Sequence, residues 1–358
     1  MRHDIVVVGA GLSGVHAARL LHRAGADFVV QEASPRIGGR ILSLGTDGGR
    51  GPFDMGPSWY WPAFQPRMPE LVRELGIRAF PQAGAGALVW EETPAECTVF
   101  ERGAPDDGSM RIDGGAAALV EALLADVPAE RVMTGHRITD LRCTPGGVSM
   151  EVACADGATT TLDARVAICT LPPRLLARSV GFDPPLPESV RADWIGVPTW
   201  MAGTAKFVAV YERPFWRDAG LSGEGRSRVG PLVEIHDASD PHGRAALTAF
   251  VGTPAHARSG ADQQLRDAAV AQLARLFGDD AAHPVACLLK DWVADPLVAT
   301  DDDMQPLRAH PSYGGEAPPP GEWAERLLLG GTESARTHGG YMEGALEAAE
   351  AAVAAALA

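Results

Sequence analysis

Residues 5–14 read IVVVGAGLSG, and this stretch decides the fold expected of the chain. An apolar run leads directly into Gly9-x-Gly11-x-x-Gly14, and an apolar-periodic stretch follows, which predicts a strand, a tight turn and a helix. A dinucleotide-binding fingerprint requires this context. Gly9 lets the chain turn, Gly11 lets the backbone approach a pyrophosphate, and Gly14 lets the helix pack closely on the strand. The free N–H groups at the start of the helix then face the phosphates.

A carboxylate follows the second predicted strand at the distance that the fingerprint expects. The second predicted strand, Asp27 to Val30, ends near Glu32, about the distance at which the fingerprint places an acid that holds a ribose hydroxyl. An acid rather than a basic residue argues against a cofactor with a 2′-phosphate. The residues up to this point leave NAD and FAD as alternatives.

The composition indicates a globular protein with two domains or one large one. The chain has 358 residues, 46% of them hydrophobic, and a formal net charge of −15; an acidic balance without a basic cluster argues against a nucleic-acid partner. Five scattered cysteines without a C-x-x-C pair predict neither disulfides nor a zinc site, so no metal is expected. We expect a cytoplasmic protein and no membrane contact, because the first strand leaves no room for a signal peptide and no apolar run has membrane-spanning length.

The loop after Glu32 distinguishes between NAD and FAD as the cofactor. Residues 36–40 read RIGGR, and with this loop the sequence resembles the flavin monoamine oxidase family, whose members carry G-x-G-x-S-G, an acid and R-x-G-G-R in this order. The chain would be a short, bacterial-type member. The resemblance implies FAD as the cofactor and places Arg40 near its pyrophosphate, where a guanidinium fork suits phosphate oxygens.

Further segments extend the resemblance over nearly the whole chain. Residues 53–59, FDMGPSW, look like the family's D-x-G-G segment, with Pro57 in place of the usual second glycine. Residues 330–333, GGTE, and 339–345, GGYMEGA, resemble its G-T-E and G-Y-M-E-G-A signatures, and the helix that opens there would point its N-terminus at the flavin. The cofactor-binding residues that the resemblance implies are Gly9, Gly11, Ser13, Gly14, Glu32, Arg36, Gly39, Arg40, Gly56, Pro57, Ser58, Trp59, Ile138, Trp292, Gly331, Glu333, Tyr341 and Met342.

A lysine inside an apolar predicted strand is the candidate catalytic cation. Lys206 lies within residues 204–211, TAKFVAVY, which PFWR follows closely. A buried lysine must find an acceptor or a water, or lose its charge. The resemblance implies that Lys206 holds a water at the flavin N5. The alternative is a lysine on the exposed face of an edge strand.

Two tyrosines complete the predicted catalytic set. The resemblance gives Tyr341 and Tyr313 as two facing rings, a slot that orients an amine and accepts a cation. Some family members carry a flavin-linking cysteine immediately before one of these rings, whereas this chain has Ser312. We therefore expect FAD to be bound non-covalently.

The predicted fold class is α/β, with a Rossmann-like FAD-binding domain of the GR2 type and a smaller α+β substrate domain. The cofactor signals fall in three separated blocks, so the FAD-binding domain is expected to be discontinuous. It would comprise residues 1–57, 113–175 and 287–358, and the substrate domain residues 58–112 and 176–286. Other expected elements are strands at 159–162, 164–169 and 205–211, helices at 261–276 and 345–358, and loops at 102–108 and 314–321.

The region between Trp61 and Asp113 is much shorter than in typical members of the family. This region normally supplies helices that enclose the substrate. The site is therefore expected to be more open, differently lidded, or completed by a partner subunit, for example in a homo-oligomer.

The activity that the resemblance implies is oxidation of a small amine at the C–H bond next to its nitrogen. Hydride would pass to the flavin N5, with dioxygen as the oxidant and hydrogen peroxide as the product. Two alternatives stay open: an FAD-dependent desaturase or dehydrogenase of the carotenoid and protoporphyrinogen type, and a non-enzymatic, flavin-loaded partner protein. No arginine can be assigned to an α-carboxylate, so the sequence leaves an amino-acid substrate open.

Overall fold

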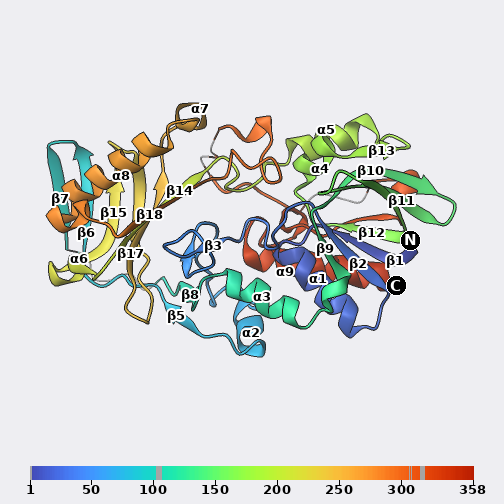
Figure 1. Cartoon of the computed structure of the whole chain (residues 1–358), viewed down its shortest axis with the longest axis horizontal. Coiled ribbons are helices and arrows are strands. Elements are labelled where there is room, and N and C mark those ends of the chain that lie inside the picture. Colours follow the sequence, from blue (N-terminus) through green and yellow to red (C-terminus); the bar gives the residue numbers. More distant parts are fainter. Residues whose placement is uncertain (1, 102–106, 306, 308, 315–318) are drawn as a thin grey trace.

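The computed structural model describes residues 2–101, 107–305, 307, 309–314 and 319–358. It has two lobes, each built on one large sheet, and both chain termini lie on the same lobe, at the right of Figure 1. This mixed architecture confirms the predicted α/β class.

The first lobe holds an eight-stranded sheet in which β12, β1 and β2 run parallel. β1 ends in four buried residues and β2 is buried throughout, because parallel strands are covered on both faces. Helices α1 (Leu12–Arg23) and α9 (Met342–Leu357) contribute to one hydrophobic core with this sheet. In order, the strands are β13 (Gly181–Asp183), β10 (His136–Thr144), β11 (Gly147–Cys154), β12 (Thr159–Cys169), β1 (Arg2–Val8), β2 (Phe28–Glu32) and β9 (Val132–Thr134), with β19 (Leu327–Leu329) paired to β12.

The turn between β1 and α1 depends on its glycines. Gly9 has a φ of 100°, which residues with a side chain rarely adopt. A Cβ atom on Gly14 would lie 1.9 Å from the carbonyl oxygen of Gly9, so only glycine lets α1 begin this close to the strand. The carboxyl ends of β1 and β2 consequently open onto the crevice where α/β folds bind ligands.

The second lobe is a seven-stranded sheet whose strand β14 is buried along its whole length between β17 and β18. Alternate residues of a strand face opposite sides. Phe207 joins the core beneath α8, whereas Val208 packs near Phe53 and Met55 of the first block of the chain; Lys206 lies on the same side as Val208. The strands are β18 (Ala286–Asp291), β14 (Ala205–Tyr211), β17 (Ala245–Val251), β16 (Leu232–Asp237), β15 (Leu221–Ser227), β6 (Ala87–Thr93) and β7 (Glu96–Phe100), and α8 spans Asp262–Phe277.

An ion-pair cluster ties two further helices to α1. The guanidinium of Arg19 binds Glu74 at 2.9 Å and Asp126 at 2.7 Å, at the ends of α2 and α3. The remaining elements are α2 (Arg67–Glu74), α3 (Ala117–Ala125), α4 (Pro173–Ser179), α5 (Glu188–Gly196), α6 (Phe215–Asp218), α7 (Ala255–Arg258), β3 (Ser43–Leu44), β4 (Phe53–Asp54), β5 (Ala79–Pro81) and β8 (Met110–Ile112), with 3₁₀ turns at Ala129–Arg131, Asp279–Ala282, Asp301–Asp303, Gly321–Trp323 and Thr332–Ser334.

Strand pairing and core packing depart from the predicted domain boundaries at three places. β13 lies beyond residue 175 but pairs with β10 of the first sheet. Most of β18 lies in the predicted FAD-binding segment 287–358, but it pairs with β14 of the second sheet. Helix α2, predicted in the substrate domain, packs Met68 and Leu71 into the core of the first lobe. The lobe to which each of these three elements belongs depends on long-range contacts, which the sequence does not display.

The expected local elements agree well with the structure. The strand at 205–211 is β14, and the helices at 261–276 and 345–358 are α8 and α9. The two strands expected at 159–162 and 164–169 form one strand, β12, because Asp163 keeps its pairing with β1 and β11. Much of the two predicted loops, at 102–106 and 315–318, lies outside the described residues.

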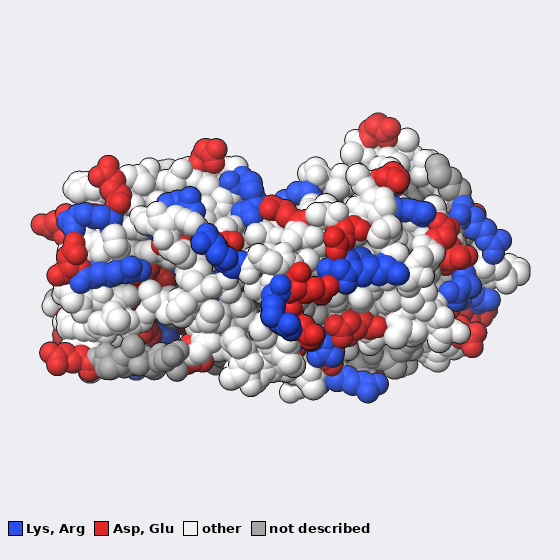
Figure 2. All heavy atoms as spheres, turned by 90° about the horizontal axis from the view of Figure 1, so that it is seen from below, with Lys and Arg blue, Asp and Glu red and all other residues white. Residues whose placement is uncertain are grey.

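The surface carries charges of both signs close together. Figure 2 shows the molecule from below, with Lys and Arg side chains interspersed among Asp and Glu. Within the described residues, no helix combines the length and apolar character that crossing a membrane requires.

Candidate active site

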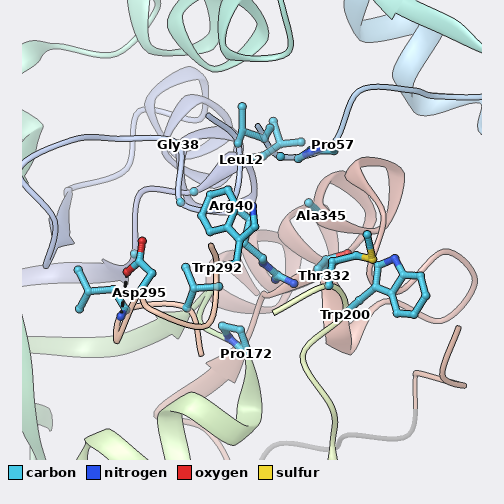
Figure 3. Close-up of a pocket in the computed structure, with 18 of the residues that line it drawn as sticks. Leu12, Gly38, Arg40, Pro57, Pro172, Trp200, Trp292, Asp295, Thr332 and Ala345 are labelled. Atoms are coloured by element: carbon cyan, nitrogen blue, oxygen red, sulfur yellow. Dashed lines mark hydrogen bonds between the residues drawn. The ribbon is translucent and has the colours of Figure 1, made fainter. Parts of the chain in front are cut away.

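A cavity of about 680 Å³ extends from the carboxyl ends of β1 and β2 to strand β14 of the second lobe. Small-molecule sites typically occupy about 300 to 1,000 Å³. Segments far apart in the sequence converge on it: Figure 3 shows Gly38 and Arg40, Trp200 from the chain before β14, and Trp292 and Asp295 from the chain after β18.

Glu32 provides a fixed carboxylate on the wall of this cavity. Its Oε2 accepts a hydrogen bond from the backbone N–H of Ala10 at 2.6 Å, and its Oε1 accepts one from Ser34 at 2.7 Å. The side chain is buried, yet it lines the cavity. Each carboxylate oxygen has a further lone pair, so both are available to accept hydroxyl hydrogens of a ribose.

The RIGGR loop lies directly on the glycine turn. The N–H of Gly38 donates to the carbonyl of Ala10 at 2.8 Å, and a Cβ on Gly39 would come within 3.2 Å of the Gly11 Cα. The guanidinium of Arg36 lines the cavity but donates to carbonyls of its own loop, at Ile37, Gly39 and Ile41. Arg36 therefore holds the loop in shape as well as forming part of the wall.

Arg40 and Glu333 form a two-pronged ion pair behind the cavity wall. The two guanidinium nitrogens of Arg40 donate to Oε1 and Oε2 of Glu333 at 2.6 and 3.1 Å. Glu333 is fully buried, whereas Arg40 faces the cavity. Burial opposes the charge on Arg40, but the Glu333 carboxylate outweighs it and raises the pKa of the guanidinium. A permanent positive charge is thus fixed beside the glycine turn.

Four residues of the predicted cofactor-binding set support the structure around the cavity: Ser13, Gly14, Gly331 and Glu333. The hydroxyl of Ser13 donates to the backbone carbonyls of Gly330 and Ala345, which ties α1 to α9. Gly14, Gly331 and Glu333 lie behind the wall and do not line the cavity. The predicted residues that do line it are Gly9, Gly11, Ser13, Glu32, Arg36, Gly39, Arg40, Gly56, Pro57, Ser58, Trp59, Ile138, Trp292, Tyr341 and Met342.

Lys206 extends from β14 into the cavity and is buried, with 2% of its surface exposed. Its Nζ donates to the carbonyl of Gly56 at 2.9 Å and to Oγ of Ser58 at 2.6 Å, and lies 5.5 Å from the ring centre of Trp59. Burial lowers its pKa from 10.5 to about 8, although the Asp54 carboxylate opposes this shift. Since β14 is flanked on both sides, the alternative of an exposed edge strand is excluded.

Trp292, which follows β18 of the second lobe, binds the same segment of chain as Lys206, residues 55–58. Its indole N–H donates to the carbonyl of Met55 at 2.9 Å. Together with Lys206, which binds Gly56 and Ser58, it fixes residues 55–58 along the cavity wall.

The structure does not show the two facing tyrosines that the sequence predicts. The ring stacked on Tyr341 is that of His310, with ring centres 4.7 Å apart and planes 14° from parallel. Tyr313 does not line the cavity; its hydroxyl donates to the carbonyl of Pro198 at 2.7 Å, and its ring lies edge-on to His310. The hydrogen bond to Pro198 draws the Tyr313 side chain away from the slot, so the prediction that it faces Tyr341 is corrected.

Several cavity residues were not found from the sequence. Phe250 lies opposite Lys206 in the β14–β17 pairing, and Trp200 comes from the irregular chain before β14. Glu234 of β16 accepts hydrogen bonds from Arg226 and from His236 at 2.7 Å; burial opposes its charge, but these two partners outweigh burial and lower its pKa to about 2. Only the strand register could have predicted Phe250 and Glu234.

The family of proteins described as flavin-containing amine oxidoreductases matches this chain over residues 12–102 and 83–357. The chain belongs to this family. The two matching stretches overlap at residues 83–102, inside the segment predicted to be shortened. This flavoenzyme is therefore an FAD-dependent amine oxidoreductase.

Individual relatives match over most of their length. An L-amino acid dehydrogenase of Synechocystis is 25% identical, covering 98% of this chain and 93% of the relative. A putrescine oxidase of Kocuria rosea is 25% identical over 82% of each chain. Among solved structures, a putrescine oxidase bound to putrescine superposes with a TM-score of 0.81 at 20% identity, covering 99% of this chain and 98% of the other, and a cyclohexylamine oxidase from Brevibacterium oxydans with 0.79 at 19%, covering 99% and 98%.

The cavity fits the FAD of this family. A glycine turn without side chains adjoins the fixed charge of Arg40, which suits a pyrophosphate. The Glu32 carboxylate has free lone pairs for a ribose. The cavity then continues across to Lys206 and Tyr341, where a ring system and a substrate can meet.

Proposed function

We propose that this enzyme oxidises a small amine without an α-carboxylate to the imine, using non-covalently bound FAD and dioxygen. Bound FAD supplies the hydride acceptor, N5, and its reduced form passes two electrons to dioxygen, which gives hydrogen peroxide. The observation that carries the proposal is Lys206, a buried cation held at Gly56 and Ser58 inside the cavity that joins the two lobes.

The protein's contribution is mainly the positioning of groups. Lys206 is fixed by two hydrogen bonds, and its third N–H is free to orient a water. A pKa of about 8 leaves both of its protonation states accessible near neutral pH, so Lys206 can hold or accept a proton at Nζ. Trp59 and Phe250 surround it with apolar surface that excludes bulk water.

The charges on the cavity wall favour an amine without a carboxylate. The arginines that line the cavity are Arg36, Arg40 and Arg137, all from the first lobe, among the residues that the structure describes. The second lobe and the chain after β18 contribute Lys206 and the carboxylates of Glu234 and Asp295. An α-carboxylate needs a guanidinium or an equivalent donor, and a desolvated carboxylate without one is costly.

The decisive test begins with the absorption spectrum of the purified protein, before and after acid precipitation. A flavin band that is released into the supernatant supports non-covalent FAD. Anaerobic titration with putrescine, benzylamine, cyclohexylamine and L-amino acids follows. Bleaching by a simple amine and recovery in air, with formation of hydrogen peroxide, supports the proposal. Bleaching by L-amino acids alone would contradict the substrate class, and bleaching without recovery in air would contradict dioxygen as acceptor.

A further inference from the structure

The ammonium of Lys206 faces two aromatic rings in the wall of the cavity. Its Nζ lies over the ring of Trp59, 5.5 Å from the ring centre, and over the ring of Phe250, 5.8 Å from the centre. The two ring centres are 6.4 Å apart and the ring planes are tilted by 54°. Both rings line the cavity. A cation within about 6 Å of a ring centre is attracted by the negative face of the ring.

The sheet of the second lobe positions Phe250. The strand register pairs Lys206 of β14 with Phe250 of β17, and Phe250 with Glu234 of β16. Residues paired in this way project from the same face of a sheet, so Phe250 stands between the lysine and the carboxylate in this row. Glu234 binds Arg226 and His236 instead. The neighbour that β17 offers to Lys206 is therefore a ring and not a charge.

Contacts with the second lobe fix the ring of Trp59. The indole N–H donates to Oε1 of Gln82 at 2.6 Å, and the amide nitrogen of Gln82 donates to the carbonyl of Asp237 at 2.7 Å. The ring of His236 lies in a T-shaped arrangement with Trp59, with ring centres 5.0 Å apart. The position of the Trp59 ring over Lys206 is thus determined by these partners as well as by the lysine.

The charged groups that act on Lys206 from other elements oppose one another. Burial lowers its pKa to about 8; the Asp54 carboxylate opposes this shift and the Arg111 guanidinium adds to it. Lys290, which lies opposite on β18, is paired with Asp295. Since the two hydrogen-bond acceptors of Lys206 are uncharged, stabilisation of the ammonium here depends on neutral groups, the two rings among them.

We infer that Trp59 is a positioning residue for the proposed reaction: its ring face, together with that of Phe250, keeps Lys206 cationic inside the cavity. The inference rests on the proposed function, because the water that Lys206 would orient belongs to that reaction. A ring face attracts the ammonium but not the neutral amine. Replacing the ring with an aliphatic side chain should therefore lower the pKa of Lys206 further. A ring that only excluded water would have the opposite effect, because its removal would let the pKa rise toward 10.5.

The first experiment measures this pKa in the FAD-loaded enzyme, by NMR titration of protein labelled with ¹³C at the lysine ε-carbons. Trp59→Leu should lower the midpoint of Lys206 by about 0.5 to 1.5 pH units and leave that of Lys290 nearly unchanged. Trp59→Phe keeps a ring face and should lower it less. Trp90→Leu removes a ring that lies over Arg228 and serves as the matched control. An unchanged or raised midpoint of Lys206 in Trp59→Leu would overturn the inference.

The second experiment keeps the shape of the ring and changes only its charge distribution. Replacing tryptophan with 5-fluorotryptophan throughout the protein weakens the negative ring faces, so the midpoint of Lys206 should fall by about 0.2 to 0.5 pH units. The same labelling should not move it in Trp59→Phe. Lys290 lies 4.6 Å from the ring centre of Trp292 and should shift in the same direction, which provides an internal control. A midpoint of Lys206 that fluorination leaves in place would refute the role of the ring.

The third experiment relates the ring to the reaction. The rate at which dioxygen reoxidises the reduced enzyme is measured by stopped flow as a function of pH. Its midpoint should follow the protonation of Lys206 and fall in Trp59→Leu by the amount that the NMR titration gives, whereas Trp90→Leu should keep the wild-type profile. A pH-dependent rate whose midpoint does not move in Trp59→Leu would overturn the inference alone. A rate that does not depend on pH in the wild type would contradict the proposed role of Lys206 itself.

Discussion

Lys206 and Lys290, the only lysines of the chain, lie directly opposite each other on the neighbouring strands β14 and β18. Residues paired in this way project from the same face of a sheet, and like charges there repel. Lys290 is paired with Asp295 at 2.9 Å, whereas the hydrogen-bond acceptors of Lys206 are uncharged. The buried lysine is thus the one whose charge has no direct counter-ion.

This relationship makes the pKa of Lys206 directly measurable. Protein labelled with ¹³C at the lysine ε-carbon should give two ε-CH₂ signals, and Lys206→Met should remove one of them. The Lys206 signal should titrate with a midpoint near pH 8, because burial lowers its pKa to about 8. A midpoint at or above 10 would contradict the buried position.

The lowered pKa of Lys206 also makes the stability of the folded protein depend on pH. The folded-state pKa of about 8 lies below the ordinary value of 10.5, so between these pH values the unfolded chain binds the proton that the folded chain has lost. The destabilisation caused by the buried charge is full below pH 8 and is relieved as the pH rises toward 10.5. As the pH rises from 7 to 10, the Tm of the wild type should therefore increase relative to the Tm of Lys206→Met. A pH-independent difference would show that the burial of the charge has no such cost.

Lys206→Met should also slow flavin reoxidation or turnover by at least about tenfold while FAD stays bound, because the variant has no N–H to orient water. Stopped-flow absorbance after mixing the reduced enzyme with air-saturated buffer measures the rate. Lys290→Met removes the other lysine from the same face of the sheet and controls for a general loss of charge. Equal rates for wild type and Lys206→Met would remove this lysine from the mechanism.

The sequence predicted the cofactor end of the cavity better than the substrate end, and the reason is physical. Gly9, Gly11 and Glu32 act through a local turn and two adjacent strands, so their spacing carries the geometry. The position of Phe250 depends on the register of β17 with β14, and that of Trp200 on the path of the irregular chain before β14. Neither the strand register nor the path of an irregular segment produces a periodic pattern in the sequence.

Replacing the acid of the dinucleotide turn should empty the cofactor site. Glu32→Ala removes the acceptors of the Ala10 and Ser34 N–H groups as well as those for the ribose, and each unsatisfied group costs about 1 to 3 kcal/mol. The purified variant should be mostly apoprotein, with FAD affinity reduced by at least about tenfold in a flavin-fluorescence titration. Glu32→Gln, which keeps one acceptor oxygen, should retain more flavin. A fully yellow Glu32→Ala protein would contradict the role of this carboxylate.

The Arg40–Glu333 pair should behave as one unit. Arg40→Gln leaves the fully buried Glu333 carboxylate without its partner, and breaking a buried pair from one side costs about 3 to 5 kcal/mol. Arg40→Gln combined with Glu333→Gln removes both charges, so the double variant should be more stable than Arg40→Gln alone. Thermal unfolding of the four proteins, each measured as apoprotein and with FAD, gives the coupling energy of the pair. Because Arg40 faces the cavity while Glu333 does not, the Tm gained on adding FAD should fall in both Arg40 variants and persist in Glu333→Gln. Additive effects on stability would mean that the two side chains act independently.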